Sequence, residues 1–299
     1  MTTPTDVLDA AFDRLGRWGF DDPGGYVNHG PMVCEALDAL GRPAEVDSWS
    51  RQDTGTPPVD PVEPRRFVWT EALGDPTRAG EWMGHFERAV ADQGWAPVLH
   101  EWLPRLLPGL GVALFHGAIR CAHAARAIEA ADTPARRAEL VRSLGYWAAL
   151  FGEGQAPDHD ALRGEDDVER EVVRAAADAA RHYLVRPNII QLHGVTAAMA
   201  VSVLIRHTDE ATAAGALAQV KAEQAALWEH TVPVAATPAP EVDEARLIDA
   251  SIASGDAHAV KLVEAARRGF AATGDPIFLA AAERAARRGL RKLMQEEPG

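Results

Sequence analysis

The stretch Leu110–Ala131, LGVALFHGAIRCAHAARAIEAA, shows the pattern that decides the fold. Its small and apolar residues recur every three to four positions, the spacing that gives an α-helix one buried face. Two histidines and one arginine lie inside this apolar pattern, at His116, Arg120 and His123. Ala, Leu, Arg and Glu dominate most of the 299 residues, whereas alternating β-branched runs are scarce. We therefore predict an all-α protein with polar residues in its helical core.

The same periodicity, read along the chain, places the expected helices and loops. Proline after an N-cap residue marks helix starts, as at Thr133-Pro134 and Asp275-Pro276. Helices are expected near 5–18, 31–40, 77–92, 97–107, 110–131, 134–151, 166–184, 189–206, 209–229, 243–254, 257–272 and 276–295. Segments rich in Pro, Gly or Asp are expected to be loops, at 51–64, 152–167 and 231–240. Because the polar residues of interest are spread over all these segments, we predict one multi-helix globular domain spanning 1–299.

The charge and cysteine content exclude several classes of protein. Thirty Lys and Arg against 44 Asp and Glu give a net charge of −14, which disfavours nucleic-acid or membrane partners. Two cysteines are too few for a disulfide scaffold or a four-cysteine metal site. The N-terminus has no secretory pattern, and the most apolar stretch, Val195–Ile205, is too short to span a bilayer. We expect a cytoplasmic protein, and its Ala-rich helices permit a homodimer.

Common catalytic motifs are missing from the sequence. There is no phosphate-binding G-x-x-x-x-G-K-[ST] loop, and Gly109-Leu110-Gly111 follows no predicted strand, so it is no dinucleotide fingerprint. His100-Glu101 lacks the second histidine of H-E-x-x-H, and no G-x-S-x-G elbow is present. These absences disfavour kinases, dehydrogenases, proteases and esterases.

Five of the eleven histidines lie among small and apolar neighbours: His29, His116, His123, His193 and His258. A glycine follows three of them directly, which allows either a ligand or a second helix to approach the backbone closely. His258 and Lys261 are three residues apart, so a helix puts them on one face, where both can reach one ion. His116 and His123 are two turns apart, so it is easier for only one of them to ligate.

These residues favour a metal site but leave other interpretations open. Neutral imidazoles suit Fe, Zn, Cu or Ni, and oxygen ligands shift the preference toward Fe or Mn. A buried Lys261 with a lowered pKa could capture CO₂ as a carbamate, an anionic oxygen ligand that an all-histidine site lacks. Equally, each histidine could be a hydrogen-bonded core residue, Lys261 a lysine at a helix edge, and Arg120 an internal ion-pair partner.

Four short motifs, in order along the chain, resemble those of the questin oxidase-like family, a group of oxygenases of aromatic polyketide pathways. The matching segments are Asn28-His29-Gly30-Pro31-Met32, His116-Gly117-Ala118-Ile119-Arg120, Leu192-His193-Gly194-Val195-Thr196 and Asp256-Ala257-His258-Ala259-Val260-Lys261. Together they span most of the chain. The resemblance implies an all-helical fold and a ring-opening oxygenase that acts on a quinone or related aromatic polyketide with O₂.

The resemblance also implies a ligand set and cofactors. Non-haem Fe(II) would be held by His29, His116, His193 and His258, with Lys261 beside the last. His123 stands where some relatives carry an aromatic residue, so it is expected, with Arg120, to orient the substrate or move a proton rather than bind metal. NADPH would act as an external reductant, because the sequence has no nucleotide-binding motif. The reaction would be that of a ring-cleaving dioxygenase or a Baeyer–Villiger-type monooxygenase in antibiotic biosynthesis.

Two other functions remain open on sequence alone. In a metal-free oxygenase, His29 or His123 would deprotonate a phenol, and the resulting carbanion would react directly with O₂. Alternatively, the chain would be a helical module that binds a hydrophobic ligand without catalysis. Metal content separates the first of these from the metal oxygenase, and oxygen uptake separates the second.

Overall fold

The computed structural model describes residues 4–64, 66–157, 167–228, 232–233 and 243–296. Within these ranges no β-strand is present, and an isolated antiparallel bridge joins Asp21 and Val27. The prediction of an all-α protein is confirmed. The expected loop at 231–240 lies almost wholly outside the described residues, as does the middle of the loop at 152–167.

The described residues between 4 and 106 contain six α-helices and one 3₁₀ turn. They are α1 (Pro4–Leu15), α2 (Gly30–Ala39), α3 (Pro43–Gln52), α4 (Trp69–Ala72), η1 (Pro76–Arg78), α5 (Ala79–Gln93) and α6 (Trp95–Leu106). Helix α3 was not predicted, because it buries only Val46 and Ser50 and so shows no apolar stripe in the sequence. Its proline start, Pro43 after Arg42, was the signal that could have located it.

The described residues from 107 to 296 contain the helices that build the centre of the molecule. They are η2 (Leu107–Gly109), η3 (Val112–Phe115), α7 (His116–Ala130), α8 (Pro134–Ala149), α9 (Val168–Val185), α10 (Ile189–Leu204), η5 (Ile205–His207), α11 (Glu210–Trp228), α12 (Glu244–Ser254), α13 (Ala257–Thr273) and α14 (Ile277–Glu296). The helix expected from residue 110 therefore begins at His116 instead, because the backbone before it turns the other way.

That turn has an unusual backbone. Ala113, Leu114 and Phe115 have φ values of 49°, 54° and 68°, all in the left-handed region that favours glycine. Left-handed conformation costs an L-residue roughly 1–2 kcal/mol, so the surrounding structure must hold these residues in place. The consequence is that His116 becomes the first residue of α7, with Nδ1 of its side chain 2.7 Å from the carbonyl oxygen of Ala113 in that turn.

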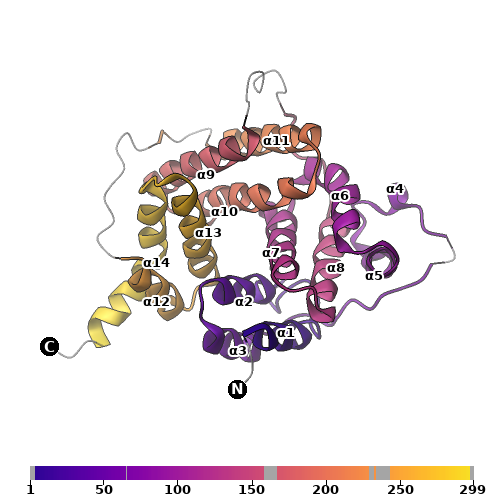
Figure 1. The fold of residues 1–299 in the computed structure, drawn as a ribbon, viewed down its shortest axis with the longest axis horizontal. Helices are drawn as coiled ribbons and strands as arrows, with labels where there is room; N and C mark the ends of the chain where they lie inside the picture. Colours follow the sequence, from indigo (N-terminus) through magenta and orange to yellow (C-terminus); the bar gives the residue numbers. More distant parts are fainter. Residues whose placement is uncertain (1–3, 65, 158–166, 229–231, 234–242, 297–299) are drawn as a thin grey trace.

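Helices α7 and α10 lie in the middle of the molecule, with α1–α3 along one edge and α12–α14 at one side (Figure 1). Helix α10 packs against α9, α7 and α13, and α2 packs against α3, α7 and α13. These contacts bring the N-terminal ends of α2, α7, α10 and α13 together, although they are far apart in the sequence.

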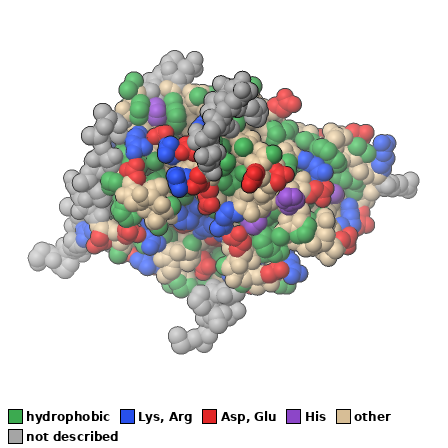
Figure 2. All heavy atoms as spheres, turned by 45° about the horizontal axis from the view of Figure 1, so that its top comes forward, with side chains coloured by type: hydrophobic (Ala, Val, Ile, Leu, Met, Phe, Trp, Pro, Cys, Tyr) green, Lys and Arg blue, Asp and Glu red, His purple; other side chains and the backbone are tan. Residues whose placement is uncertain are grey.

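The most apolar helix is a core helix. Ile189–His207 is long and apolar enough to cross a membrane by length and composition, but 83% of its most apolar window is buried within the protein. The apolar stretch Val195–Ile205 noted in the sequence belongs to it. Outside this core, basic and acidic side chains are interspersed on the face drawn in Figure 2.

Candidate metal centre

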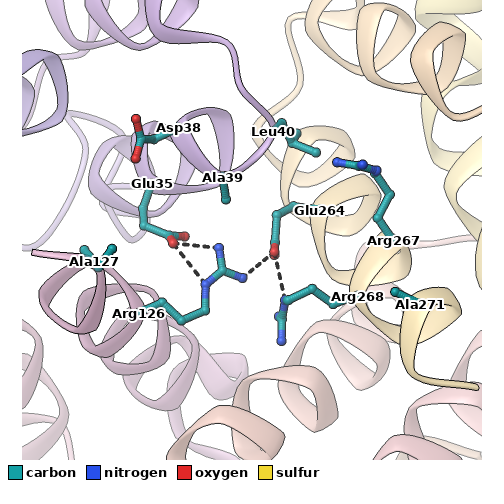
Figure 3. Close-up of a pocket in the computed structure, with 11 residues that line it drawn as sticks. Glu35, Asp38, Ala39, Leu40, Arg126, Ala127, Glu264, Arg267, Arg268 and Ala271 are labelled. Atoms are coloured by element: carbon teal, nitrogen blue, oxygen red, sulfur yellow. Dashed lines mark hydrogen bonds and ion pairs between the residues drawn. The ribbon is translucent and has the colours of Figure 1, made fainter. Parts of the chain in front are cut away.

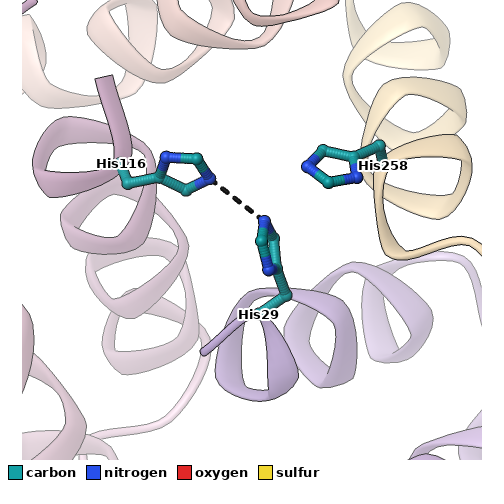
Figure 4. A group of neighbouring side chains, drawn as sticks. All are labelled: His29, His116 and His258. Carbon is teal, nitrogen blue, oxygen red and sulfur yellow. Dashed lines mark hydrogen bonds between the residues drawn. The ribbon is translucent and has the colours of Figure 1, made fainter. Parts of the chain in front are cut away.

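Four histidine side chains meet where α2, α7, α10 and α13 begin, and three of them are drawn in Figure 4. We call His29, His116, His193 and His258 the histidine cluster. Taken in this order and back to His29, successive ring centroids lie 5.0, 4.6, 5.2 and 4.5 Å apart. The four rings thus form a closed circuit, and each comes from within the first two turns of its helix or immediately before it.

The nitrogen atoms of the cluster are close enough to share one ion. Nε2 of His116 lies 3.1 Å from Nε2 of His29 and 3.2 Å from Nε2 of His193. One nitrogen each of His29, His116 and His258 lies within 4.8 Å of the others. Two imidazole nitrogens bound to one ion at about 2.0–2.1 Å are about 3 Å apart at a right angle and about 3.4 Å apart at a tetrahedral angle. The two shortest separations fall in this range.

Hydrogen bonds on the outer side of two rings set their tautomers. Nδ1 of His116 donates to the carbonyl oxygen of Ala113 at 2.7 Å, and Nδ1 of His193 donates to that of Ile189 at 2.7 Å. A neutral imidazole protonated on Nδ1 has a bare acceptor at Nε2. The Nε2 atoms of His116 and His193 therefore face each other as two lone pairs, a repulsive contact that a cation between them would relieve.

A carboxylate orients the fourth ring. Oδ1 of Asp256 lies 3.2 Å from Nδ1 of His258 and also accepts from the backbone N–H of His258 at 2.9 Å. These bonds lower the pKa of the Asp256 carboxyl. A carboxylate behind a histidine is a common arrangement at metal sites, since it fixes the ring and raises the basicity of the other nitrogen.

The cluster is neutral at neutral pH. Burial is the largest cause that lowers the pKa of each of the four histidines, and the charge of Lys261 lowers it further. The pKa of His116 falls to about 3. Because protonated imidazole cannot ligate, these low pKa values keep the histidines in the form that binds metal.

Lys261 is buried beside the cluster, with 1% of its surface exposed. Among the described residues, its Nζ makes its one hydrogen-bond contact with the sulfur of Met32, at 3.9 Å. Burial lowers the pKa of Lys261 to about 7. A substantial fraction of this amine is therefore uncharged at neutral pH, which makes it a nucleophile.

The two residues expected to orient the substrate have strong partners of their own. Arg120 donates from Nε and Nη2 to the two carboxylate oxygens of Glu139, at 2.7 and 3.2 Å, and its buried Nη1 has no hydrogen-bond partner in the described structure. His123 is not in the cluster, because Nδ1 lies 2.5 Å from Oε2 of Glu35. Both residues are thus buried beside a carboxylate partner, one and two turns beyond His116.

His123 belongs to a second buried polar group, which we call the charge network: Glu35, His123, Arg126, Glu264 and Arg268. Arg126 bridges Glu35 and Glu264, and Arg268 donates to Glu264 at 2.8 Å (Figure 3). Sequence reasoning assigned no role to Glu35 or Glu264, because neither lies near Arg126 in the chain.

The glycines that follow three cluster histidines have different roles. A Cβ on Gly30 would lie 2.4 Å from Oδ2 of Asp53, and one on Gly117 would lie 2.5 Å from the Trp147 ring. These two glycines are required by packing within the protein, the simpler of the two explanations considered from the sequence. A Cβ on Gly194 would meet nothing closer than 3.5 Å, so protein packing does not require that glycine.

Comparison with known proteins adds no identity to this site. No family model matches the chain, and no curated protein matches it.

Proposed function

We propose that this chain is a non-haem metal oxygenase that opens a ring of a quinone or related aromatic polyketide with O₂. The observation that carries the metal centre is the convergence of four neutral imidazoles, two of them with Nδ1 committed to backbone carbonyls and Nε2 facing inward. The substrate class rests on the resemblance of the four histidine motifs to questin oxidase-like proteins.

Fe(II) fits the donors better with Lys261 than without it. Four neutral imidazoles bring no negative charge to balance a divalent cation, and no carboxylate belongs to the histidine cluster itself. A carbamate on Lys261 would add one anionic oxygen and shift the preference toward Fe or Mn. Bound Fe(II) would supply the one-electron chemistry that lets O₂ react with a closed-shell aromatic molecule.

The carbamate forms by a balanced addition. The uncharged Nζ of Lys261 attacks the carbon of CO₂, a nitrogen–carbon bond forms, and one Nζ proton passes to solvent. No oxidant or leaving group is needed. The buried position of Lys261 favours this step because it lowers the pKa of the amine to about 7.

The protein around the cluster favours an anionic substrate. The N-terminal ends of α2, α7 and α13 point their positive dipole ends at the same place. A phenolate or enolate oxygen is therefore stabilised there. In this proposal Arg120, whose buried Nη1 has no hydrogen-bond partner in the described structure, would orient such a substrate, and His123, beside Glu35, would hold or pass a proton.

The outcome of the reaction decides whether a reductant is used. A ring-cleaving dioxygenase places both oxygen atoms in the product and needs no external electrons. A Baeyer–Villiger-type monooxygenase inserts one atom and reduces the other to water, which consumes two electrons and two protons. NADPH would supply these electrons from outside the protein.

Metal analysis of matched variants tests the proposal. Plasma mass spectrometry of the wild type should find about one transition metal per chain, with iron preferred after anaerobic Fe(II) loading. His193→Ala and Lys261→Ala should lose it, whereas His182→Ala, a buried histidine that stacks on Trp228 outside the cluster, should retain it. Full occupancy in His193→Ala and His258→Ala would refute the metal assignment.

Oxygen uptake with a hydroxylated anthraquinone separates the remaining functions. The metal oxygenase should consume O₂ only when loaded. Equal uptake by chelator-treated protein would establish the metal-free oxygenase. Tight binding of the anthraquinone without any uptake, in metal-loaded protein, would leave the non-catalytic binding module.

A further inference from the structure

A surface pocket opens on the side of the charge network (Figure 3). Its volume is about 440 Å³, and it is lined by α2, α7 and α13, with Glu35, Arg126, Glu264 and Arg268 among its polar residues. The ion pair between Arg126 and Glu264 lies across its inner wall.

A second, much smaller cavity lies behind that wall. Its volume, measured as the space open to the centre of a water molecule, is about 10 Å³, which is room for about one water. Arg126, Glu264 and Arg268 line this cavity as well as the surface pocket, so the two are neighbours across one layer of side chains. On its inner side the small cavity is lined by Lys261, His123 and Thr196.

Glu264, which lines the small cavity, has a carboxylate oxygen without a hydrogen-bond partner among the described residues. Oε2 of Glu264 is buried and has no hydrogen-bond partner in the described structure, whereas Oε1 accepts from Arg126 and Arg268. A buried carboxylate oxygen without a partner is costly, and a bound water is its usual solution. The polar lining of the small cavity is therefore suited to a bound water, unlike that of an apolar packing defect.

We propose that the surface pocket and the small cavity form an access route along which water and CO₂-sized molecules reach Lys261, with the Arg126–Glu264 ion pair as its gate. The ligand class is a small linear molecule with polar ends. The route rests on the proposed carbamate for its biological purpose, because a buried lysine can be carbamylated only if CO₂ reaches its Nζ. Its existence can be tested without any metal.

Cyanate is a suitable reagent, because its acid HNCO has the size and shape of CO₂. It adds to an amine with formation of a nitrogen–carbon bond, one amine proton moves to the reagent nitrogen, and nothing leaves. The chain has three lysines, so Lys221 and Lys292 provide internal references in the same sample. Labelling of the full-length, chelator-treated chain at pH 8.5 would be followed by peptide mass spectrometry.

Two substitutions in the small cavity make a matched pair. Ala200→Val adds two carbon atoms to its wall, whereas Thr196→Val changes the wall's chemistry but keeps its size. We expect Lys261 to be labelled in the wild type and in Thr196→Val, and about tenfold more slowly in Ala200→Val, with Lys292 unchanged throughout. Equal labelling of Lys261 in the two variants, or no labelling in the wild type, would overturn the proposal.

Reagent size gives a second test that needs no variant. Trinitrobenzenesulfonate is too large for the small cavity and should label exposed Lys292 but not Lys261. If it labels Lys261 as readily as cyanate does, the lysine is reached through a wide opening or by unfolding, and the route is wrong. A failure of metal binding would leave these results untouched, so the two proposals can fail separately.

Discussion

Helices α2, α7 and α13 each contribute to two buried polar groups, and the two are built on opposite principles. In the charge network, Arg126 and Arg268 face Glu35 and Glu264, so every charge has an opposite partner. In the histidine cluster the rings are neutral, with the Asp256 carboxylate behind His258 and the buried Lys261, whose contact is the Met32 sulfur, as the neighbouring charged groups.

This difference in charge pairing marks the charge network as a structural group and the histidine cluster as the candidate site. A network in which each charge faces an opposite charge mainly stabilises the packing of the helices that carry it. Inward-facing acceptors with no donor between them are unfavourable in the empty protein, and they become favourable only when a cation binds. Both groups contain histidine, so burial of histidine alone does not distinguish them. The cluster differs in that Nε2 of His116 lies 3.1 and 3.2 Å from Nε2 of two other imidazoles.

Acid should distinguish the two groups most strongly. The histidine pKa values are lowered on folding, so the unfolded chain binds more protons, and stability that is full above about pH 6.5 is lost as the pH falls toward 3. His116 alone should cost about 3 kcal/mol between pH 6.5 and 4. Urea unfolding of metal-free protein from pH 7 to 4 measures this slope.

His116→Asn should lower that slope by about one proton. The charge network should lose its contribution to stability at a lower pH than the histidine cluster does. Burial would raise the pKa of Glu264, but the charges of Arg126 and Arg268 lower it to about 2, so its contribution is present above pH 4.5 and is lost below that. A wild-type stability that is flat from pH 7 to 4 would contradict the neutral cluster.

Arg126→Met should break the charge network, because it leaves Glu35 and Glu264 buried without their shared partner. The expected loss is about 3–5 kcal/mol of unfolding free energy at pH 7, measured by chemical denaturation. Arg267→Met is the matched control, since its partner Glu244 is 41% exposed and such pairs contribute under about 1 kcal/mol. Equal effects of the two variants would mean that the network does not stabilise the fold.

Lys261→Met should raise the free energy of unfolding, whereas Arg126→Met lowers it. The pKa of Lys261 is lowered from 10.5 to about 7. Between these pH values the lysine is protonated in the unfolded chain but uncharged in the folded protein, so wild-type stability should rise with pH. Replacing the ammonium with an apolar side chain should remove this rise and stabilise the protein at pH 6 by roughly 2–4 kcal/mol. The exposed Lys292→Met should change neither quantity. A loss of stability in Lys261→Met at pH 6 would show that the lysine is not buried as a charge.

Ala113→Gly should give the smallest effect, a gain of about 0.5–1 kcal/mol, because Ala113 is exposed and adopts a left-handed φ that glycine tolerates. Ala10→Gly, at an exposed position inside α1, should instead lose about 1 kcal/mol. Thermal melting of the pair compares them directly. If both variants lose stability, the turn before His116 is not strained.

Local patterns in the sequence were enough for much of the fold. The 3.6-residue periodicity located most helices to within a few residues, since it records which side of each helix is buried. It missed α3, which is largely exposed, and it extended α7 back to residue 110, because three left-handed residues in succession leave no mark in a run of Ala, Leu and Phe. Whether the chain is a single domain stays a prediction.

Some features of the candidate site, like those of the fold, follow from the sequence, and the others depend on the tertiary structure. The sequence by itself determined which histidines lie in apolar helical segments, and that Lys261 shares a helix face with His258, because neighbours within one helix follow from spacing alone. Only the tertiary structure decided that His123 joins Glu35 instead of the cluster, that Arg120 is paired with Glu139, and that backbone carbonyls of Ala113 and Ile189 set two tautomers. The physical reason is that these contacts depend on how α2, α7, α8, α10 and α13 pack, and a main-chain carbonyl carries no side-chain identity for a sequence to reveal.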